Sequence, residues 1–473
     1  MSGARTPSSV RTPVREQLPS VLVASLSAAF GVGLLQVTGY LAAVMRSDDV
    51  LGSSQVVELM LRLTAVVFLV IAVYVGAVVT ANTIATIVAG RARTIALLRL
   101  LGSTAGAQRR SIASEGLMVG AAGAVIGTVV GTAVALAISR IAVATGTLPD
   151  ISYVFLDPSI VLPIVGVVMS TWLAAWVGSR RVLTVTPMQA LSGSEELSRE
   201  ETLRRPGRNA ASLALLIIGT LFLLLGIAVG LASPLGVLIG LVGGVVSFTG
   251  VVLGADVVMP VALRLVGRLL GRSAPARLAA ENALRHPQRS SRATIGLVIG
   301  VTLLMTFGVA MTSFQQMIHA ANEARPGPAD AQFDQFIAAL VAVFSILIGF
   351  SGVIAAVGLV NNLSLSVLQR TRELGLLRAL GFSIAQLRRM ILSEAGQLTA
   401  TAVLLGLVLG SFYGWAGAQS MLGSVGAGLV LPTLPWLIVL IVIGSAVVLT
   451  AIASWAPTRR ATRVSPVTAL AVD

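Results

Sequence analysis

Side chains that could do chemistry are scarce in this chain. The 473 residues include no cysteine, no lysine and two histidines far apart, His286 and His319. Without cysteine there is no thiolate metal site or disulfide, and we expect no bound metal. A phosphate-binding loop needs a lysine that reaches the β- and γ-phosphates, so we expect no ATPase in this chain. No serine–histidine–aspartate set occurs, and we predict that the chain is not an enzyme.

A few polar residues stand out because they lie in or beside long apolar runs. Asn82 and Asn361 could form a polar patch in a central cleft, or make hydrogen bonds that fix helix packing. Glu115 and Glu394 lie where helices are expected to begin, and a structural role beside the helix dipole is predicted for both. Ionisable residues in mid-span are nearly missing, which argues against a proton-coupled transporter.

The most informative stretch occurs twice. Residues 93–115 match residues 372–394 without a gap at an offset of 279, and both contain Leu-Leu-Arg-x-Leu-Gly, then Arg-Arg, then Ser-Glu. The constant offset extends over roughly a hundred positions, which indicates a duplication. It also pairs two G-x-x-x-G motifs that predict close helix packing: Gly127 with Gly131, and Gly406 with Gly410.

The composition places this duplication in a membrane. The chain is 56% hydrophobic and 11% charged, with a mean hydropathy of +0.93, whereas soluble domains carry about 25% charge. We therefore predict an all-α polytopic membrane protein with ten spans of about 20 residues or more, arranged 4+2+4. The expected spans are roughly 21–44, 61–90, 115–139, 159–178, 213–232, 235–258, 293–318, 335–366, 390–416 and 433–456.

Arginine distribution predicts the orientation. The formal charge of +14 is concentrated in alternate links, as expected for cytoplasmic ends near anionic lipid headgroups. Both termini are predicted in the cytoplasm and the two repeats run parallel. The arginine clusters lack interleaved aromatic residues, so nucleic acid is not an expected partner. The predicted parts are a cytoplasmic segment 1–20, a first four-helix unit 21–191, a linker and hairpin 192–281, and a second unit 282–473.

The duplicated stretch lies between two predicted spans on the cytoplasmic side. Its apolar residues are interspersed with arginines up to Gly102, where the helix pattern is interrupted. This pattern predicts a short amphipathic helix with a glycine C-terminus, then a turn and a helix that leads into the next span. Two interpretations are open. The helix could lie on the inner leaflet, or it could dock into the groove of a cytoplasmic partner. Two equivalent docking helices would suit a two-fold symmetric partner.

The motif R-x-[IL]-x-L-L-R-x-L-G resembles the cytoplasmic loop of the FtsX/MacB-like permeases of ABC transporters. So do the segments R-R-x-x-x-x-x-P-x-x-A-L at 180–191 and 459–470, and the 4+2+4 plan resembles the bacitracin-type exporters. The resemblance implies that each loop contacts a nucleotide-binding subunit, through Leu97, Leu98, Arg99, Leu101 and Gly102, and through Leu376, Leu377, Arg378, Leu380 and Gly381.

The same resemblance implies the remaining expectations. The chain would be a multi-pass permease of a bacterial plasma membrane, in contact with membrane lipids and with two copies of a cytoplasmic ABC ATPase. It would bind no cofactor itself, because ATP and Mg²⁺ would belong to the partner. ATP hydrolysis would drive export or extraction of an amphiphilic or hydrophobic substrate. The alternative is a non-transporting transducer that relays the ATPase state to an extracellular partner.

Overall fold

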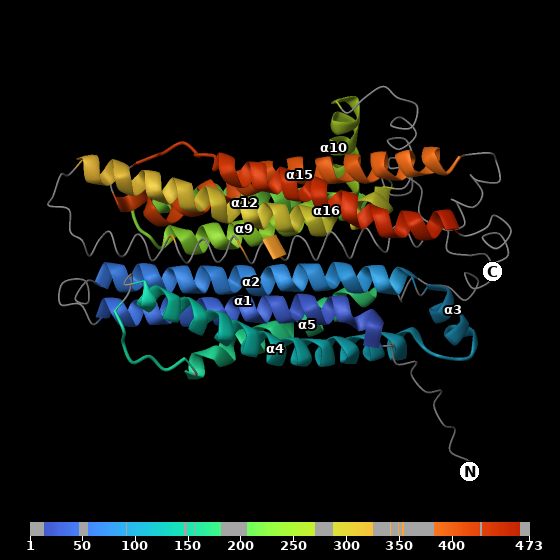
Figure 1. Ribbon diagram of the computed structural model, residues 1–473, viewed down its shortest axis with the longest axis horizontal. Helices are drawn as coiled ribbons and strands as arrows, with labels where there is room; N and C mark the ends of the chain where they lie inside the picture. The colour runs from blue at the N-terminus through green and yellow to red at the C-terminus, as the bar shows by residue number, and fades with distance from the viewer. Residues whose placement is uncertain are drawn as a thin grey trace, which may run out of the picture. The chain divides into compact units, whose positions relative to one another are not determined.

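The computed structural model describes residues 14–46, 55–90, 92–145, 149–155, 157–180, 206–269, 287–324, 341, 349, 352–353, 383–425 and 428–463. Within these ranges the secondary structure is helical and no strand is present (Figure 1). The chain divides into two compact units. The first consists of residues Met1–Glu195 with Ala331–Val343, and the second of Glu196–Asp330 with Phe344–Asp473.

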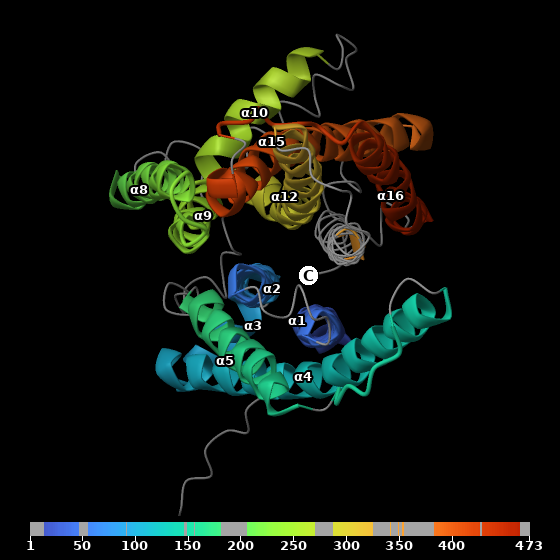
Figure 2. The same cartoon turned by 90° about the vertical axis from the view of Figure 1, so that its left-hand side faces the viewer.

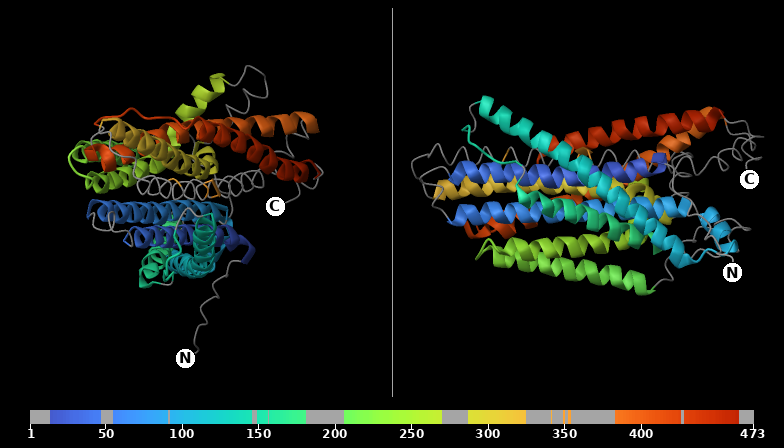
Figure 3. Two further views of the ribbon diagram at one scale, coloured as in Figure 1. Left: turned by 60° about the vertical axis from the view of Figure 1, so that its left-hand side comes forward. Right: turned by 90° about the horizontal axis from the view of Figure 1, so that it is seen from below.

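The first unit consists of four long helices and a short one at their end. The long helices are α1 (Val14–Arg46), α2 (Gln55–Gly90), α4 (Ala105–Ala144) and α5 (Val161–Gly178), and the short helix is α3 (Ala92–Leu100). A 3-10 turn, η1 (Pro158–Ile160), precedes α5. The helix α4 runs obliquely across α1 and packs on both α1 and α5 (Figure 3).

The second unit contains a hairpin and a further helical group. The hairpin is α8 (Pro206–Gly230) with α9 (Gly236–Leu253), and α10 (Ala255–Leu269) follows directly. The other helices are α12 (Pro287–Ala324), α15 (Ile384–Leu422), the 3-10 turn η3 (Gly423–Val425) and α16 (Trp436–Arg463). Figure 2 shows α15 between the α8–α9 hairpin and α16, and α15 contacts all three helices.

Eight helices of the described part are long and apolar enough to cross a membrane. They cover eight of the ten predicted spans. A ninth, predicted at 433–456, falls on α16, where the apolar stretch among the described residues is Trp436–Val448. The tenth, 335–366, lies almost entirely outside the described residues, so ten spans in a 4+2+4 plan stay a prediction. The chain is a multi-pass membrane protein.

Glycine allows the closest helix contacts in both units. A Cβ on Gly127 would lie 2.4 Å from the Ser25 carbonyl oxygen, and one on Gly131 would lie 2.5 Å from that of Ala29. In the second unit, a Cβ on Gly410 would lie 2.6 Å from the Thr302 carbonyl oxygen, and Gly406 faces Val301. The two G-x-x-x-G motifs therefore bring α4 onto α1 and α15 onto α12 at backbone distance.

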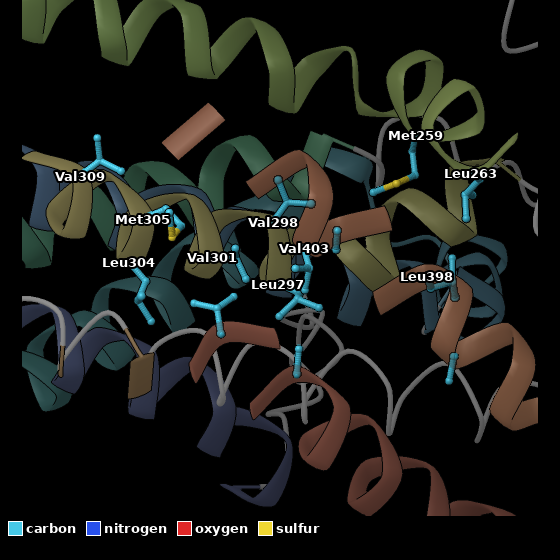
Figure 4. Packing of buried hydrophobic residues seen from close by; sticks show 14 residues of the cluster. Met259, Leu263, Leu297, Val298, Val301, Leu304, Met305, Val309, Leu398 and Val403 are labelled. Carbon is cyan, nitrogen blue, oxygen red and sulfur yellow. The ribbon is translucent and has the colours of Figure 1, made fainter. Parts of the chain in front are cut away.

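The remaining core of the second unit is aliphatic. Met259 and Leu263 of α10 pack with Leu297, Val298 and Val301 of α12, and with residues of α15 and α16 (Figure 4). The sequence did not predict α10, because the apolar run continues through residue 258. The helix α9 instead ends at Leu253 with Gly254 as its C-cap, and Asp256 lies in the first turn of α10. There its carboxylate pairs with Arg208 of α8 at 2.9 Å.

Candidate functional site

The first copy of the duplicated stretch folds into a helix, a turn and a second helix. The short helix α3 ends at Leu100, and Gly102 follows with a φ of +94°. The N–H of Gly102 donates to the Arg99 carbonyl at 3.1 Å, and that of Ser103 donates to the Leu98 carbonyl at 2.9 Å. This pair of bonds is a Schellman motif, which needs the left-handed backbone that glycine adopts without strain.

The second helix begins in the same register in both copies. Thr104 caps α4 by accepting the Ala107 N–H, and Ser383 caps α15 by accepting the Gln386 N–H in a capping box. These two caps are related by the 279-residue offset. Both helices start well before Glu115 and Glu394, so the expectation that these glutamates lie at a helix N-terminus is wrong. The dipole effect fades within the first turn.

One side of α3 is anchored to the ends of the spans. Ile95 and Ala96 are buried in a cluster with Ile84 and Val88 of α2 and with Ala175 of α5. Ala105 and Ile112 of α4 pack against the same cluster. A displacement of α3 would therefore be transmitted to α2, α4 and α5 together, because protein interiors are densely packed and deform little.

The other side of α3 and the turn after it expose leucines. Leu101 is 76% exposed, Leu100 is 55% exposed and Leu97 is 47% exposed, while Leu98 and Arg99 are half-buried. We call Leu97, Leu100 and Leu101 the exposed leucine patch; the helix α3 lies beyond the end of α2 (Figure 1). Such a patch of adjacent large apolar side chains is typical of a surface that binds a partner or a membrane.

Sequence comparison of the two copies missed two parts of this site. Leu100 was not a candidate because its counterpart is Ala379. The second omission is Arg109, whose guanidinium lies 4.1 Å from the ring centroid of Trp176 at the end of α5. It also donates to the Trp176 carbonyl at 3.0 Å and to Ser179 Oγ at 3.4 Å. The sequence does show that both residues recur in the second copy, since the offset pairs Arg109 with Arg388 and Trp176 with Trp455.

The other predicted residues are placed only in part. Asn82 is half-buried in α2, Glu115 is half-buried in α4, and Glu394 is buried in α15. The second set of contact residues and one asparagine lie outside the described residues: Asn361, Leu376, Leu377, Arg378, Leu380 and Gly381. Among the described residues, no group of three or more side chains suited to a metal ion is present.

Comparison with known families decides what the duplicated units are. The profile described as "FtsX-like permease C-terminal" matches the chain twice, at residues 66–187 and 345–466. Together the matches cover more than half of the chain, and they differ by the same 279 residues as the two copies. The chain belongs to the FtsX-like permease family. The predicted duplication and the predicted resemblance are thus both confirmed.

Two curated relatives of this FtsX-like permease match over shorter segments. A macrolide export ATP-binding/permease protein, MacB, of Marinobacter nauticus is 29% identical over 133 residues, which are 28% of this chain and 18% of the relative. The ABC transporter permease YtrF of Bacillus subtilis is 32% identical over 71 residues, which are 14% of this chain and 16% of the relative. The matched part of each relative is therefore less than a fifth of its length.

Proposed function

We propose that this FtsX-like permease is the membrane-spanning subunit of an ABC transporter, and that the exposed leucine patch is where a separate ATPase docks. The observation that carries the proposal is the construction of α3. One side is fixed to three spans, while the leucines on the other side remain uncovered at the position where the repeated motif occurs. A helix that presents apolar side chains in this way fits the groove of a partner protein.

We infer that a separate polypeptide would hydrolyse ATP, because these 473 residues contain no lysine for a phosphate-binding loop. ATP and Mg²⁺ would bind to that partner. Since the stretch is duplicated, two ATPase copies would bind, one to each repeat. The arginine-rich ends of the units, α3 included, would face the cytoplasm together with both termini.

Force would pass from the ATPase to the spans through the contacts of α3. Movement of the leucine patch would displace Ile95 and Ala96 against α2 and α5, and Arg109 would hold the start of α4 to Trp176. The spans would then shift and expel or extract an amphiphilic or hydrophobic substrate. An apolar substrate fits a chain whose spans expose mainly large apolar side chains and carry few mid-span charges.

The variant Leu101→Asp tests the docking assignment. Burying a leucine stabilises an interface by about 1.5–3 kcal/mol, so we expect the variant to bind the ATPase roughly ten- to hundredfold more weakly. The readout is the amount of a Walker-motif ATPase that co-purifies with the tagged chain in mild detergent. Val154→Asp is the matched control, because Val154 is 71% exposed in the link at the opposite end of the same unit.

Each outcome is informative. Loss of the ATPase from Leu101→Asp, with retention by Val154→Asp and normal membrane insertion of both, supports docking. Full retention by Leu101→Asp would overturn the proposal and leave α3 as a helix on the inner leaflet. Loss from both variants would also overturn it, because the effect would then not be specific to α3.

A further inference from the structure

The link between α15 and α16 exposes an unusual amount of apolar surface. In this α15–α16 link, residues 428–435, Leu431 is 81% exposed and Leu429 is 66% exposed. Trp436, the first residue of α16, is 69% exposed. A water-exposed loop would not normally present leucines and a tryptophan side by side, so another apolar phase is expected to cover them.

The backbone of this link is held by polar side chains of its own unit. Trp415 Nε1 donates to the Val430 carbonyl at 2.6 Å, and Gln419 Nε2 donates to the Gly428 carbonyl at 2.5 Å. Thr312 Oγ1 donates to the Thr433 carbonyl at 2.7 Å. Because these carbonyls already have donors, the cost of removing them from water is reduced.

The charge pattern of the surrounding chain supports an apolar environment. No acidic, basic or histidine residue occurs between positions 395 and 458. The equivalent stretch of the first copy, 116–179, contains Arg140, Asp150 and Asp157. A span, its link and the following helix in the second unit could therefore all contact hydrocarbon without burying a charge.

The first copy has polar residues at the three positions equivalent to Leu429, Leu431 and Trp436. The α4–α5 link, residues 149–157, has Asp150 and Ser152 where the offset places Leu429 and Leu431, and Asp157 where it places Trp436. The Asp157 carboxylate accepts the Ser159 N–H at 2.9 Å, and this hydrogen bond lowers the pKa of Asp157. An acid whose ionised form is favoured fits a link that faces water.

The exposed surface of the α15–α16 link continues along α16. Leu437, Leu440 and Ile441 are all more than half exposed, as expected for the lipid-facing side of a membrane helix. Tryptophan is enriched where the headgroups meet the acyl chains. The link and the first turns of α16 thus expose a continuous uncharged stretch of the chain that includes Trp436.

We propose that the α15–α16 link lies within the outer part of the bilayer and contacts acyl chains, whereas the α4–α5 link stays in water. The two FtsX-like units would then differ in their lipid contacts although their helices pack alike. The inference requires that the protein spans a membrane, but not that an ATPase binds, so its test is separate from the docking test.

Site-directed spin labelling tests the difference, since the chain has no native cysteine to remove. Leu431→Cys and the equivalent Ser152→Cys would each be labelled, and the protein reconstituted into phosphatidylcholine–phosphatidylglycerol vesicles. Collision rates of the label with O₂, which concentrates in hydrocarbon, and with water-soluble nickel ethylenediaminediacetate report its depth. Trp436→Cys and Asp157→Cys form a second matched pair.

We expect the labels at Leu431 and Trp436 to be accessible to O₂ and protected from nickel, and those at Ser152 and Asp157 to show the reverse. Nickel accessibility of Leu431 equal to that of Ser152 would place both links in water and overturn the proposal. Protection of all four labels would also overturn it, because the links would not differ. Size-exclusion profiles equal to that of the parent chain would confirm that the labelled variants are folded.

Discussion

The two units of this permease have similar inner packing and different outer surfaces. In the first unit a glycine pair of α4 contacts the backbone of α1 at Ala29, and in the second a glycine pair of α15 contacts the backbone of α12 at Thr302. The 279-residue offset also relates a second pair of contacts. Gly120 packs on Thr171 in the first unit, and at the equivalent positions of the second unit the hydroxyls of Thr399 and Thr450 form a hydrogen bond of 2.7 Å. The α4–α5 and α15–α16 links share little beyond hydrogen bonds from side chains that hold their backbones. Duplication has thus kept the packing while the surfaces diverged.

Replacing the glycines that both units share with alanine is expected to have the largest effect on stability. Gly131→Ala and Gly410→Ala would each place a Cβ about 2.5 Å from a carbonyl oxygen of the neighbouring helix, and overpacking costs about 1–3 kcal/mol. We expect a clear loss of thermal stability in detergent, of similar size for both variants. Gly417→Ala in α15 is the control, because an added Cβ there would meet no atom within 4 Å and alanine favours helix by about 0.5–1 kcal/mol. A loss confined to one unit would show that the packing is not shared.

Replacing Arg109 is expected to have a smaller effect on stability, and it tests a single defined contact. Arg109→Ala would remove the stacking on Trp176 and two hydrogen bonds, with an expected loss of roughly 1–2 kcal/mol. Arg109→Lys would keep the charge and recover only part of the loss, because lysine cannot form the planar fork. The offset pairs this contact with Arg388, Trp455 and Thr458.

We therefore expect Arg388→Ala to lower the melting temperature by about as much as Arg109→Ala. Melting curves of the two variants, measured side by side, check this expectation. An unaffected Arg388→Ala would show that the second unit has lost this connection.

The smallest predicted effect on stability comes from the glutamine side chains that hold the α4–α5 and α15–α16 links. Gln36 of α1 donates from Nε2 to the Phe155 carbonyl at 2.8 Å. Gln419 of α15 donates from Nε2 to the Gly428 carbonyl, and its Oε1 accepts the Val430 N–H. Gln36→Met and Gln419→Met should each cost about 1 kcal/mol. Hydrogen–deuterium exchange should rise in residues 149–155 for the first variant and in 428–434 for the second. Exchange that rises in neither link would contradict the role of these glutamines.

Much of the architecture could be predicted because a span and a repeat leave strong signals in sequence. Long apolar runs identified eight helices, and the motif at 93–102 identified a short helix that ends just before Gly102. The predicted span 115–139 lies inside α4, which begins at Ala105 because the polar lead-in is helical and continuous with the span. The break at Gly254 was missed since apolar residues continue on both sides of it, with Asp256 as the one charge nearby.

The site was harder to predict than the fold. Repetition identified which leucines recur, but exposure depends on how α3 rotates against α2 and α5. Leu100 is exposed without a leucine counterpart, while the recurring Leu98 is half-buried. The contact between Arg109 and Trp176 joins two helices far apart in sequence. The repeat shows that both residues recur, but not that they touch.

The measurement that tests the central claim most directly is the mass of the intact complex. The tagged chain would be purified in mild detergent from its native membrane, and the complex weighed by native mass spectrometry. The account predicts one permease chain with two copies of a Walker-motif ATPase, one for each repeat. A complex with a single ATPase copy, or a permease free of ATPase even after crosslinking in the membrane, would contradict it.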